Sequence, residues 1–244
     1  RDLARAVATL RAASARRLGP LGWALLAACG AVLATALVAM LAPPVGGDQT
    51  KYHLVYPRLY AAHGGLVDTP WSFWGHMQFL QNFLYAIGFA LRGDVLVRFL
   101  SAVFGVLAAW ALAGLTRRHL GRRAGVLTAT LFFTLPITWS LMTRAGNDLA
   151  VVLYAALATD ALLDWIARER AGDLRRAGVM AGLAGGSKVM GLLVPALVGL
   201  VVLGVLLRRA HPVGGVLRAA LSFGVLALVA ASPCYARNVV ETGN

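Results

Sequence analysis

Long apolar runs separated by short charged clusters dominate the chain. A membrane-spanning helix needs about 20 apolar residues to cross roughly 30 Å of hydrocarbon. Prolines 43 and 44 follow the first long run and Pro233 follows the last, so we expect both helices to end there. We predict one span from each of five runs: Leu21–Ala42, Val95–Leu115, Ala124–Leu141, Leu149–Ile166 and Val213–Ala231.

The stretch between Arg176 and Arg208 is harder to interpret. As one continuous helix its 31 intervening residues would measure about 46 Å, which is long for one span and short for two. Gly185-Gly186-Ser187-Lys188 interrupts the stretch, and glycine and serine favour a break in a helix. Lys188 would then lie at the tip between two short spans or part-way into the membrane.

The basic clusters decide between one span and two. They are Arg1–Arg17, Arg117–Arg123, Arg168–Arg176, and the group of Arg208, Arg209 and Arg218. Cytoplasmic loops collect lysine and arginine. Two spans between Arg176 and Arg208 place every cluster in the cytoplasm, whereas one span would move the last cluster outside. We therefore predict seven spans, with a cytoplasmic amphipathic segment at residues 1–20.

The longest connection, residues 43–94, then lies on the extracytoplasmic side. It holds amphipathic aromatic side chains that favour the headgroup level of a membrane, and a loop of this length in a compact protein is usually functional. Its segment Met77–Leu91 is apolar but only about 15 residues long, so we predict an interfacial or re-entrant helix there.

Composition agrees with this picture. The chain is 59% hydrophobic and only 14% charged, with a mean hydropathy of +0.72, so lipid is the solvent for most of it. The net charge of +13 comes from clusters between apolar runs, which excludes a nucleic-acid-binding protein. The sequence predicts an all-α polytopic membrane protein with one transmembrane domain at residues 21–244. Because the chain starts at Arg1 and stops after Glu241 without a terminating feature, we expect a further C-terminal part.

Ionisable groups on the outer side are the candidates for chemistry, because charge at membrane depth is costly and persists mainly where it is used. Asp48 follows two glycines that allow close approach of the backbone, and a partly desolvated carboxylate there would suit a general base. The alternative is a solvated loop residue. Asp148 begins the fourth span, where a helix-terminal acid explains it as well as catalysis does.

Several cations accompany these carboxylates. Lys188 at a helix break must reach the interface or meet an anion, and helix breaks at membrane depth are tolerated where they line a cavity. Arg144 precedes Asp148 and would form an ion pair or an anion site with it. Arg237 lies beyond the last span, and a basic residue on the outer side calls for an anionic partner. That partner would be either the donor phosphate or an anionic lipid headgroup. Carboxylates with cations suit attack on a sugar carried by a lipid phosphate.

Several short motifs carry a resemblance to a known family. They are Asp48-Gln-Thr-Lys-Tyr52-His53-Leu-Val-Tyr-Pro57-Arg58-Leu-Tyr60, Arg98-Phe-Leu-Ser101, Arg117-Arg-His-Leu-Gly121, Asn147-Asp148-Leu-Ala, Gly182-Leu-Ala-Gly-Gly-Ser-Lys188 and Ser232-Pro-Cys-Tyr-Ala-Arg237-Asn. Because these motifs occur together, the chain resembles bacterial polyprenyl-phosphate-sugar glycosyltransferases of the GT-C fold. These enzymes are related to protein O-mannosyltransferases and aminoarabinose transferases.

The resemblance implies transfer of a sugar from a polyprenyl-phosphate donor to a hydroxyl of a glycan, lipid or protein, with inversion. It implies an enzyme of the bacterial cytoplasmic membrane whose active site is extracytoplasmic. The expected site residues are Asp48 and Asp148 in catalysis, Lys188, Arg237, Arg58 and Arg144 at the donor phosphate, and Tyr52 and His53 in positioning the substrate. Family members often have Asp-Glu where this chain has Asp48-Gln49, which weakens a metal site. A divalent Mg²⁺ or Mn²⁺ on Asp48 and Asp148 stays open.

Two other functions remain at this point. A transporter or lipid flippase also uses broken helices, but it needs ionisable groups along a pathway and paired repeats, and the sequence shows neither. A non-catalytic GT-C-like membrane subunit would explain the single carboxylate at the start of the first loop.

Overall fold

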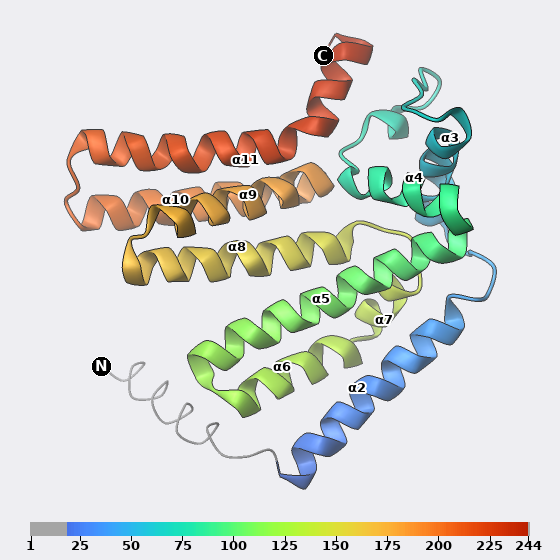
Figure 1. Cartoon of the computed structure of the whole chain (residues 1–244), viewed down its shortest axis with the longest axis horizontal. Coiled ribbons are helices and arrows are strands. Elements are labelled where there is room, and N and C mark those ends of the chain that lie inside the picture. The colour runs from blue at the N-terminus through green and yellow to red at the C-terminus, as the bar shows by residue number, and fades with distance from the viewer. Residues whose placement is uncertain (1–18, 244) are drawn as a thin grey trace.

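A computed structural model describes residues 19–243, so most of the expected N-terminal segment 1–20 lies outside the described residues. Every regular element among residues 19–243 is helical, and the helices form a layered bundle (Figure 1). The predicted class, a polytopic helical membrane protein, is confirmed.

The number of spans is smaller than predicted. Among the described residues, five helices are long and apolar enough to cross a membrane: α2 (Pro20–Ala39), α5 (Asp94–Leu120), α8 (Asp148–Arg168), η3 with α10 (Val189–Arg208) and α11 (Val213–Thr242). A bent pair, α6 (Arg122–Thr134) and α7 (Pro136–Met142), makes a sixth if it counts as one span. The remaining predicted span corresponds to α9 (Ala171–Ser187), whose 17 residues are short for a crossing.

The predicted span Ala124–Leu141 is broken rather than straight. Helices α6 and α7 meet at an angle of 70°. Leu135 between them is extended, and Pro136 is the first residue of α7. Proline disfavours the helical conformation of the residue before it, which explains the bend at this position.

The predicted break at Lys188 is present. Helix α9 ends at Ser187, Lys188 is extended, and the chain reverses through the short turn η3 (Val189–Leu192) into α10 (Leu193–Arg208). Since α9 and α10 then pack against each other, the stretch between Arg176 and Arg208 is a pair of adjacent helices.

The last helix does not end where the sequence predicted. Helix α11 continues through Pro233 as far as Thr242, and its final part turns away from the bundle (Figure 1). A proline inside a helix removes one backbone hydrogen bond and commonly bends the helix without ending it. The expected end before Pro233 was therefore wrong, and Arg237 belongs to the helix rather than to a loop.

Helix α9 packs closely on α8 and α11. Its residues Gly178, Gly182 and Gly186 recur every four positions and face the α11 backbone. A Cβ atom built on Gly182 would lie 2.1 Å from the carbonyl oxygen of Ala227, and one on Gly178 would lie 2.6 Å from that of Phe223. Small residues at this spacing allow two helices to approach closely.

The connection between α2 and α5 is ordered into short helices. It contains η1 (Gln49–His53), α3 (Val55–His63), η2 (Phe73–His76) and α4 (Leu80–Arg92). Helix α4 agrees with the predicted short helix at Met77–Leu91, while α3 was not predicted individually. Aromatic side chains of this connection form a small core of their own, which includes Tyr52, Tyr56, Tyr60 and Phe79.

The two ends of the bundle differ in charge. The α5–α6, α8–α9 and α10–α11 turns lie at one end, and the connection 43–94 lies at the other, near the start of α8 and the end of α9 (Figure 1). At the first end Asp164 pairs with Arg168 at 2.7 Å and Arg176 at 2.9 Å, and Arg209 pairs with Glu169. The three basic clusters that follow Arg1–Arg17 in the sequence therefore lie at the same end of the bundle, as the predicted topology requires.

Candidate active site

A polar cavity of about 250 Å³ lies at the end of the bundle where the connection 43–94 meets the start of α8. Four separate parts of the chain line it: the first loop with η1, Phe79 at the start of α4, the stretch from the end of α7 to the start of α8, and the break after α9. Six of the eight predicted site residues line this one cavity: Asp48, Tyr52, His53, Arg144, Asp148 and Lys188.

The loop before η1 brings Asp48 to the cavity. Gly46 has φ of +113°, a conformation that L side chains rarely adopt. Gln49 is buried, and its amide donates to the carbonyl of Val45 at 2.5 Å and accepts from the backbone N–H of Ala145 at 3.2 Å. The side chain of Gln49 therefore connects the first loop to the opposite wall. Asp48 itself is exposed, in contrast to the partly desolvated carboxylate we expected.

An ion pair joins Lys188 and Asp148 across the cavity. Lys188 Nζ lies 2.5 Å from Asp148 Oδ1, although the two residues are 40 positions apart. Asp148 occupies the first turn of α8, and the side chain of the N-cap residue Asn147 makes no capping hydrogen bond. The carboxylate is therefore paired with a cation, and that cation is Lys188 rather than Arg144.

Buried amides hold the break that presents Lys188. Asn147 Nδ2 donates to the carbonyl of Ser187 at 2.9 Å, and Gln81 Nε2 of α4 donates to the Ser187 hydroxyl at 2.9 Å. A helix end leaves carbonyl groups without partners inside the helix, so these bonds stabilise the end of α9. The fully buried Tyr85 of α4 donates to the carbonyl of Gly146 at 2.6 Å and fixes the neighbouring segment.

Aromatic rings form the wall beside Asp48. The Tyr52 ring stacks between Trp74 at 4.6 Å and Phe79 at 5.0 Å between centroids. Burial and a hydrogen bond to Asp48 raise the pKa of the Tyr52 phenol well above its usual value. Tyr52 thus remains a hydrogen-bond donor to the Asp48 carboxylate.

His53 contributes a neutral imidazole to the same wall. Its Nδ1 lies 3.4 Å from Asn82 Oδ1, so Nδ1–H donates when the proton is on that nitrogen. Burial lowers the pKa of His53 to about 4. The ring is therefore uncharged at neutral pH, and the cationic side chains that line the cavity are Arg144 and Lys188.

The other three predicted phosphate ligands differ in placement. Arg144 is exposed at the cavity rim and makes no ion pair with any described residue. Arg58 is exposed and does not line the cavity. Arg237 lies beside a neighbouring small cavity, where it donates to Glu241 at 2.9 Å and to the Tyr60 hydroxyl at 2.8 Å. The structure thus brings Arg144, but neither Arg58 nor Arg237, to Asp48 and Lys188.

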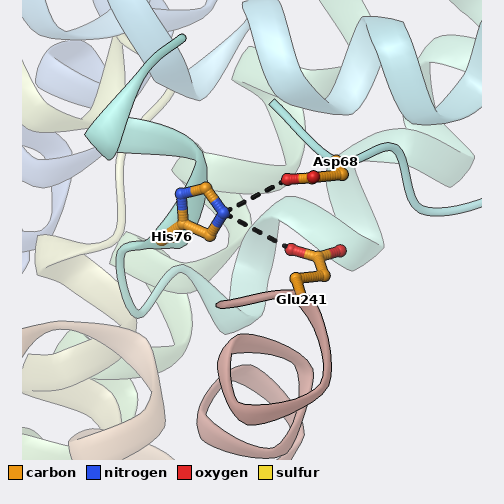
Figure 2. A group of neighbouring side chains, drawn as sticks. All are labelled: Asp68, His76 and Glu241. Carbon is orange, nitrogen blue, oxygen red and sulfur yellow. Dashed lines mark ion pairs between the residues drawn. The ribbon is translucent and has the colours of Figure 1, made fainter. Parts of the chain in front are cut away.

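Metal-ligand spacing occurs elsewhere. Among the described residues, a group with such spacing consists of Asp68, His76 and Glu241, shown in Figure 2. Asp48 and Asp148 do not belong to it, although both line the polar cavity. Asp68 and His76 lie in the connection 43–94, which we predicted to be extracytoplasmic, and the sequence predicted no role for any of the three residues.

Sequence reasoning also missed the amides that position the site: Gln49, Gln81 and Asn147. A signal for one of them, Gln81, was present in the sequence. Gln81-Asn82 are adjacent amides inside an otherwise apolar segment, and a polar side chain in such a place is usually buried with a partner.

Comparison with known protein families gives a match over most of the bundle. The family of dolichyl-phosphate-mannose-protein mannosyltransferases matches residues 76–235, which is about two thirds of the chain. Neither the curated proteins nor the solved structures searched contain a match to this chain. The matched region includes Asp148, Lys188 and Arg144 but begins after Asp48. On this match, the chain belongs to the dolichyl-phosphate-mannose-protein mannosyltransferase family of membrane glycosyltransferases.

Proposed function

We propose that this protein transfers a sugar from a polyprenyl-phosphate donor to an acceptor hydroxyl, with inversion at the sugar carbon. The observation that carries the proposal is the cavity shared by Asp48, the Lys188–Asp148 pair and Arg144. It combines a carboxylate able to take a proton with two cations able to bind a phosphate. Such a combination suits the departure of a lipid phosphate from a sugar.

In the proposed reaction, the Asp48 carboxylate accepts the proton of the acceptor hydroxyl. The hydroxyl oxygen attacks the anomeric carbon from the face opposite the phosphate. The bond between that carbon and the phosphate oxygen breaks, and the lipid phosphate leaves with the electron pair. Lys188 and Arg144 stabilise the negative charge on the leaving phosphate, as preorganised cations do in phosphate sites.

Asp148, Tyr52 and His53 act on the arrangement of these groups. Asp148 holds the Lys188 ammonium in place through their ion pair. The Tyr52 hydroxyl orients the Asp48 carboxylate, and the neutral His53 ring offers its free nitrogen to a sugar hydroxyl. Arg58 and Arg237 have no direct role at the donor phosphate in this proposal, because neither lines the cavity.

The donor lipid has a suitable surface beside the cavity. Helix α10 begins close to Lys188 and carries exposed apolar side chains, including Leu193, Leu197 and Leu200. A polyprenyl chain would lie along this surface within the bilayer while its phosphate reaches Lys188. We place the cavity on the extracytoplasmic face of a bacterial cytoplasmic membrane, with a glycan, lipid or protein as acceptor.

Replacing Asp48 by asparagine tests the proposal. The change keeps the size of the side chain but removes the base, and general base catalysis contributes about 10²–10⁴-fold to rate. We expect sugar transfer from a radiolabelled polyprenyl-phosphate sugar to fall by that factor, while membrane insertion is unchanged. Glu169→Gln, the same type of change at the opposite end of the bundle, should keep transfer. Full activity of Asp48→Asn would refute the assignment of the base.

A further inference from the structure

Three metal-binding side chains from two distant parts of the chain meet outside the polar cavity. Asp68 follows α3, His76 ends η2, and Glu241 lies in the last turns of α11. Figure 2 shows one nitrogen of the His76 ring directed toward both carboxylates. His76 Nε2 lies 3.3 Å from Asp68 Oδ1 and 3.7 Å from Glu241 Oε2.

These distances fit donors that surround one small cation. Zn²⁺ bonds to imidazole nitrogen and carboxylate oxygen are about 2.0–2.2 Å long, so the donor atoms of a tetrahedral site lie about 3.3–3.6 Å apart. The two distances from His76 Nε2 are close to this range, and the three donor atoms all lie within 4.8 Å of one another. Small side-chain adjustments would bring them onto a common ion.

His76 Nε2 supplies an independent observation. It is a buried nitrogen that makes no hydrogen bond with the described residues, although it faces two carboxylates. A buried polar atom that makes no hydrogen bond is costly, so such an atom usually has a water or an ion nearby. A cation between the three side chains would satisfy this nitrogen.

The charges around the group also call for a cation. Asp68 and Glu241 bring two negative charges together beside His76. Arg237 Nε donates to Glu241 Oε2 at 2.9 Å and supplies one positive charge. A divalent ion would neutralise the remaining negative charge and bind both carboxylates directly.

Outer contacts hold the ligands in place. Arg237 fixes the Glu241 carboxylate and also donates to Tyr60 in α3. Asn238 Nδ2 donates to the backbone carbonyl of His76. Ligating carboxylates in metal sites are typically fixed by hydrogen bonds of this kind. The contacts of Arg237 with Glu241 and Tyr60 explain why this arginine lies here and not at the polar cavity.

We propose that Asp68, His76 and Glu241 bind a divalent transition-metal cation of the Zn²⁺ type, with water as the fourth ligand. One nitrogen and two carboxylate oxygens form a donor set that Zn²⁺ accepts. The ion connects the loop after α3 to the end of α11 and thereby fixes the connection 43–94 against the last helix. This site is separate from the cavity around Asp48, and its existence does not depend on the proposed sugar transfer.

Zinc binding by the full-length protein in detergent tests this site. After removal of metal with a chelator, we expect the protein to take up one Zn²⁺ per chain in competition with a chromogenic chelator. His76→Ala, Asp68→Asn and Glu241→Gln should each weaken binding by more than the 10–100-fold that loss of an outer contact causes. Asp68 is half exposed, so its conservative variant should fold normally.

Two controls make the result decisive. His63→Ala changes an exposed histidine of the same connection, whose Nδ1 contacts the carbonyl of Leu59, and it should bind Zn²⁺ as the unchanged protein does. Asp48→Asn should also keep Zn²⁺, whatever happens to sugar transfer. Zn²⁺ should raise the melting temperature of the unchanged protein but not of Asp68→Asn. Absence of Zn²⁺ uptake by the unchanged protein, or equal uptake by all three ligand variants, would overturn the proposal.

Discussion

At the scale of single residues, buried amides determine where the reactive groups of the cavity lie. Gln49 connects the first loop to Ala145, Asn147 donates to the Ser187 carbonyl at the end of α9, and Gln81 donates to the hydroxyl of the same serine from α4. Each amide can donate and accept at once, whereas a carboxylate can only accept when ionised. The amide at position 49 is thus suited to a buried bridge between two backbone groups.

Gln49→Glu tests this role and should destabilise the protein. The new carboxylate would face the carbonyl oxygen of Val45, to which the amide now donates. Loss of a buried donor costs about 1–3 kcal/mol, so we expect a lower melting temperature in detergent. Thr50→Val, a change at the exposed neighbouring residue, serves as the control. A Gln49→Glu protein as stable as the unchanged one would show that the bridge contributes little.

His53 predicts a pH dependence of stability. Its pKa is about 4 in the folded protein and about 6.5 in an unfolded chain, so only the unfolded chain binds a proton between these values. The free energy of unfolding should therefore decrease as the pH falls from about 6.5 to 4, by on the order of 3 kcal/mol.

Comparison of melting curves with those of His53→Gln measures this contribution. The glutamine variant cannot take up the proton, so its stability should depend less on pH in that window. His63→Gln, at an exposed histidine, should behave as the unchanged protein does. Parallel pH profiles of the unchanged and His53→Gln proteins would show that burial of His53 does not disfavour its charged form.

At the scale of helices, length and hydropathy predicted the long spans well. The predicted runs beginning at Leu21, Val95 and Leu149 agree with α2, α5 and α8 to within a few residues at their starts. These helices are determined by local composition. The bend before Pro136 follows from a local preference of proline, but the continuation of α11 past Pro233 shows that the same residue type does not always end a helix. Proline was present at both places, yet it ended one helix and not the other.

Helix α9 shows a second limit of prediction. Its glycine spacing was visible in the sequence, but its partner was not, because the α11 residues Phe223, Ala227 and Ala231 lie more than 40 positions away. The same holds for the cavity. Asp48, Asp148 and Lys188 were predicted one by one from their local surroundings, while the pairing of Asp148 with Lys188 required the fold.

Gly182→Val should disrupt the packing of α9 on α11. The Cβ atom would collide with the Ala227 carbonyl, and backbone atoms of α11 cannot move away independently. We expect a loss of about 1–3 kcal/mol or more, seen as a lower melting temperature and faster proteolysis. Gly224→Ala on α11 has open space around it and should not destabilise. Similar melting temperatures for both variants would contradict the close packing.

At the scale of the whole molecule, the two ends of the bundle should face opposite sides of the membrane. One end carries the basic clusters in the α5–α6, α8–α9 and α10–α11 turns, and the other carries the polar cavity. We expect a cysteine placed at Gly64, in an exposed turn after α3, to react with a membrane-impermeant maleimide added to intact cells. A cysteine at Gly172, exposed in the first turn of α9, should react only after the membrane is opened. Cys29 and Cys234 are buried and should give little background. The reverse labelling pattern would invert the proposed orientation.

The Lys188–Asp148 pair has a consequence for the order of biosynthesis. Asp148 leaves the ribosome 40 residues before Lys188, which at 5–20 residues per second corresponds to about 2–8 s. During that interval Asp148 lacks the Lys188 ammonium with which it pairs in the folded protein. The cavity is therefore completed late, by a helix pair added from the C-terminal side. In truncated chains that stop before Lys188 the Asp148 carboxylate stays unpaired. We expect such chains to be degraded faster than the full chain.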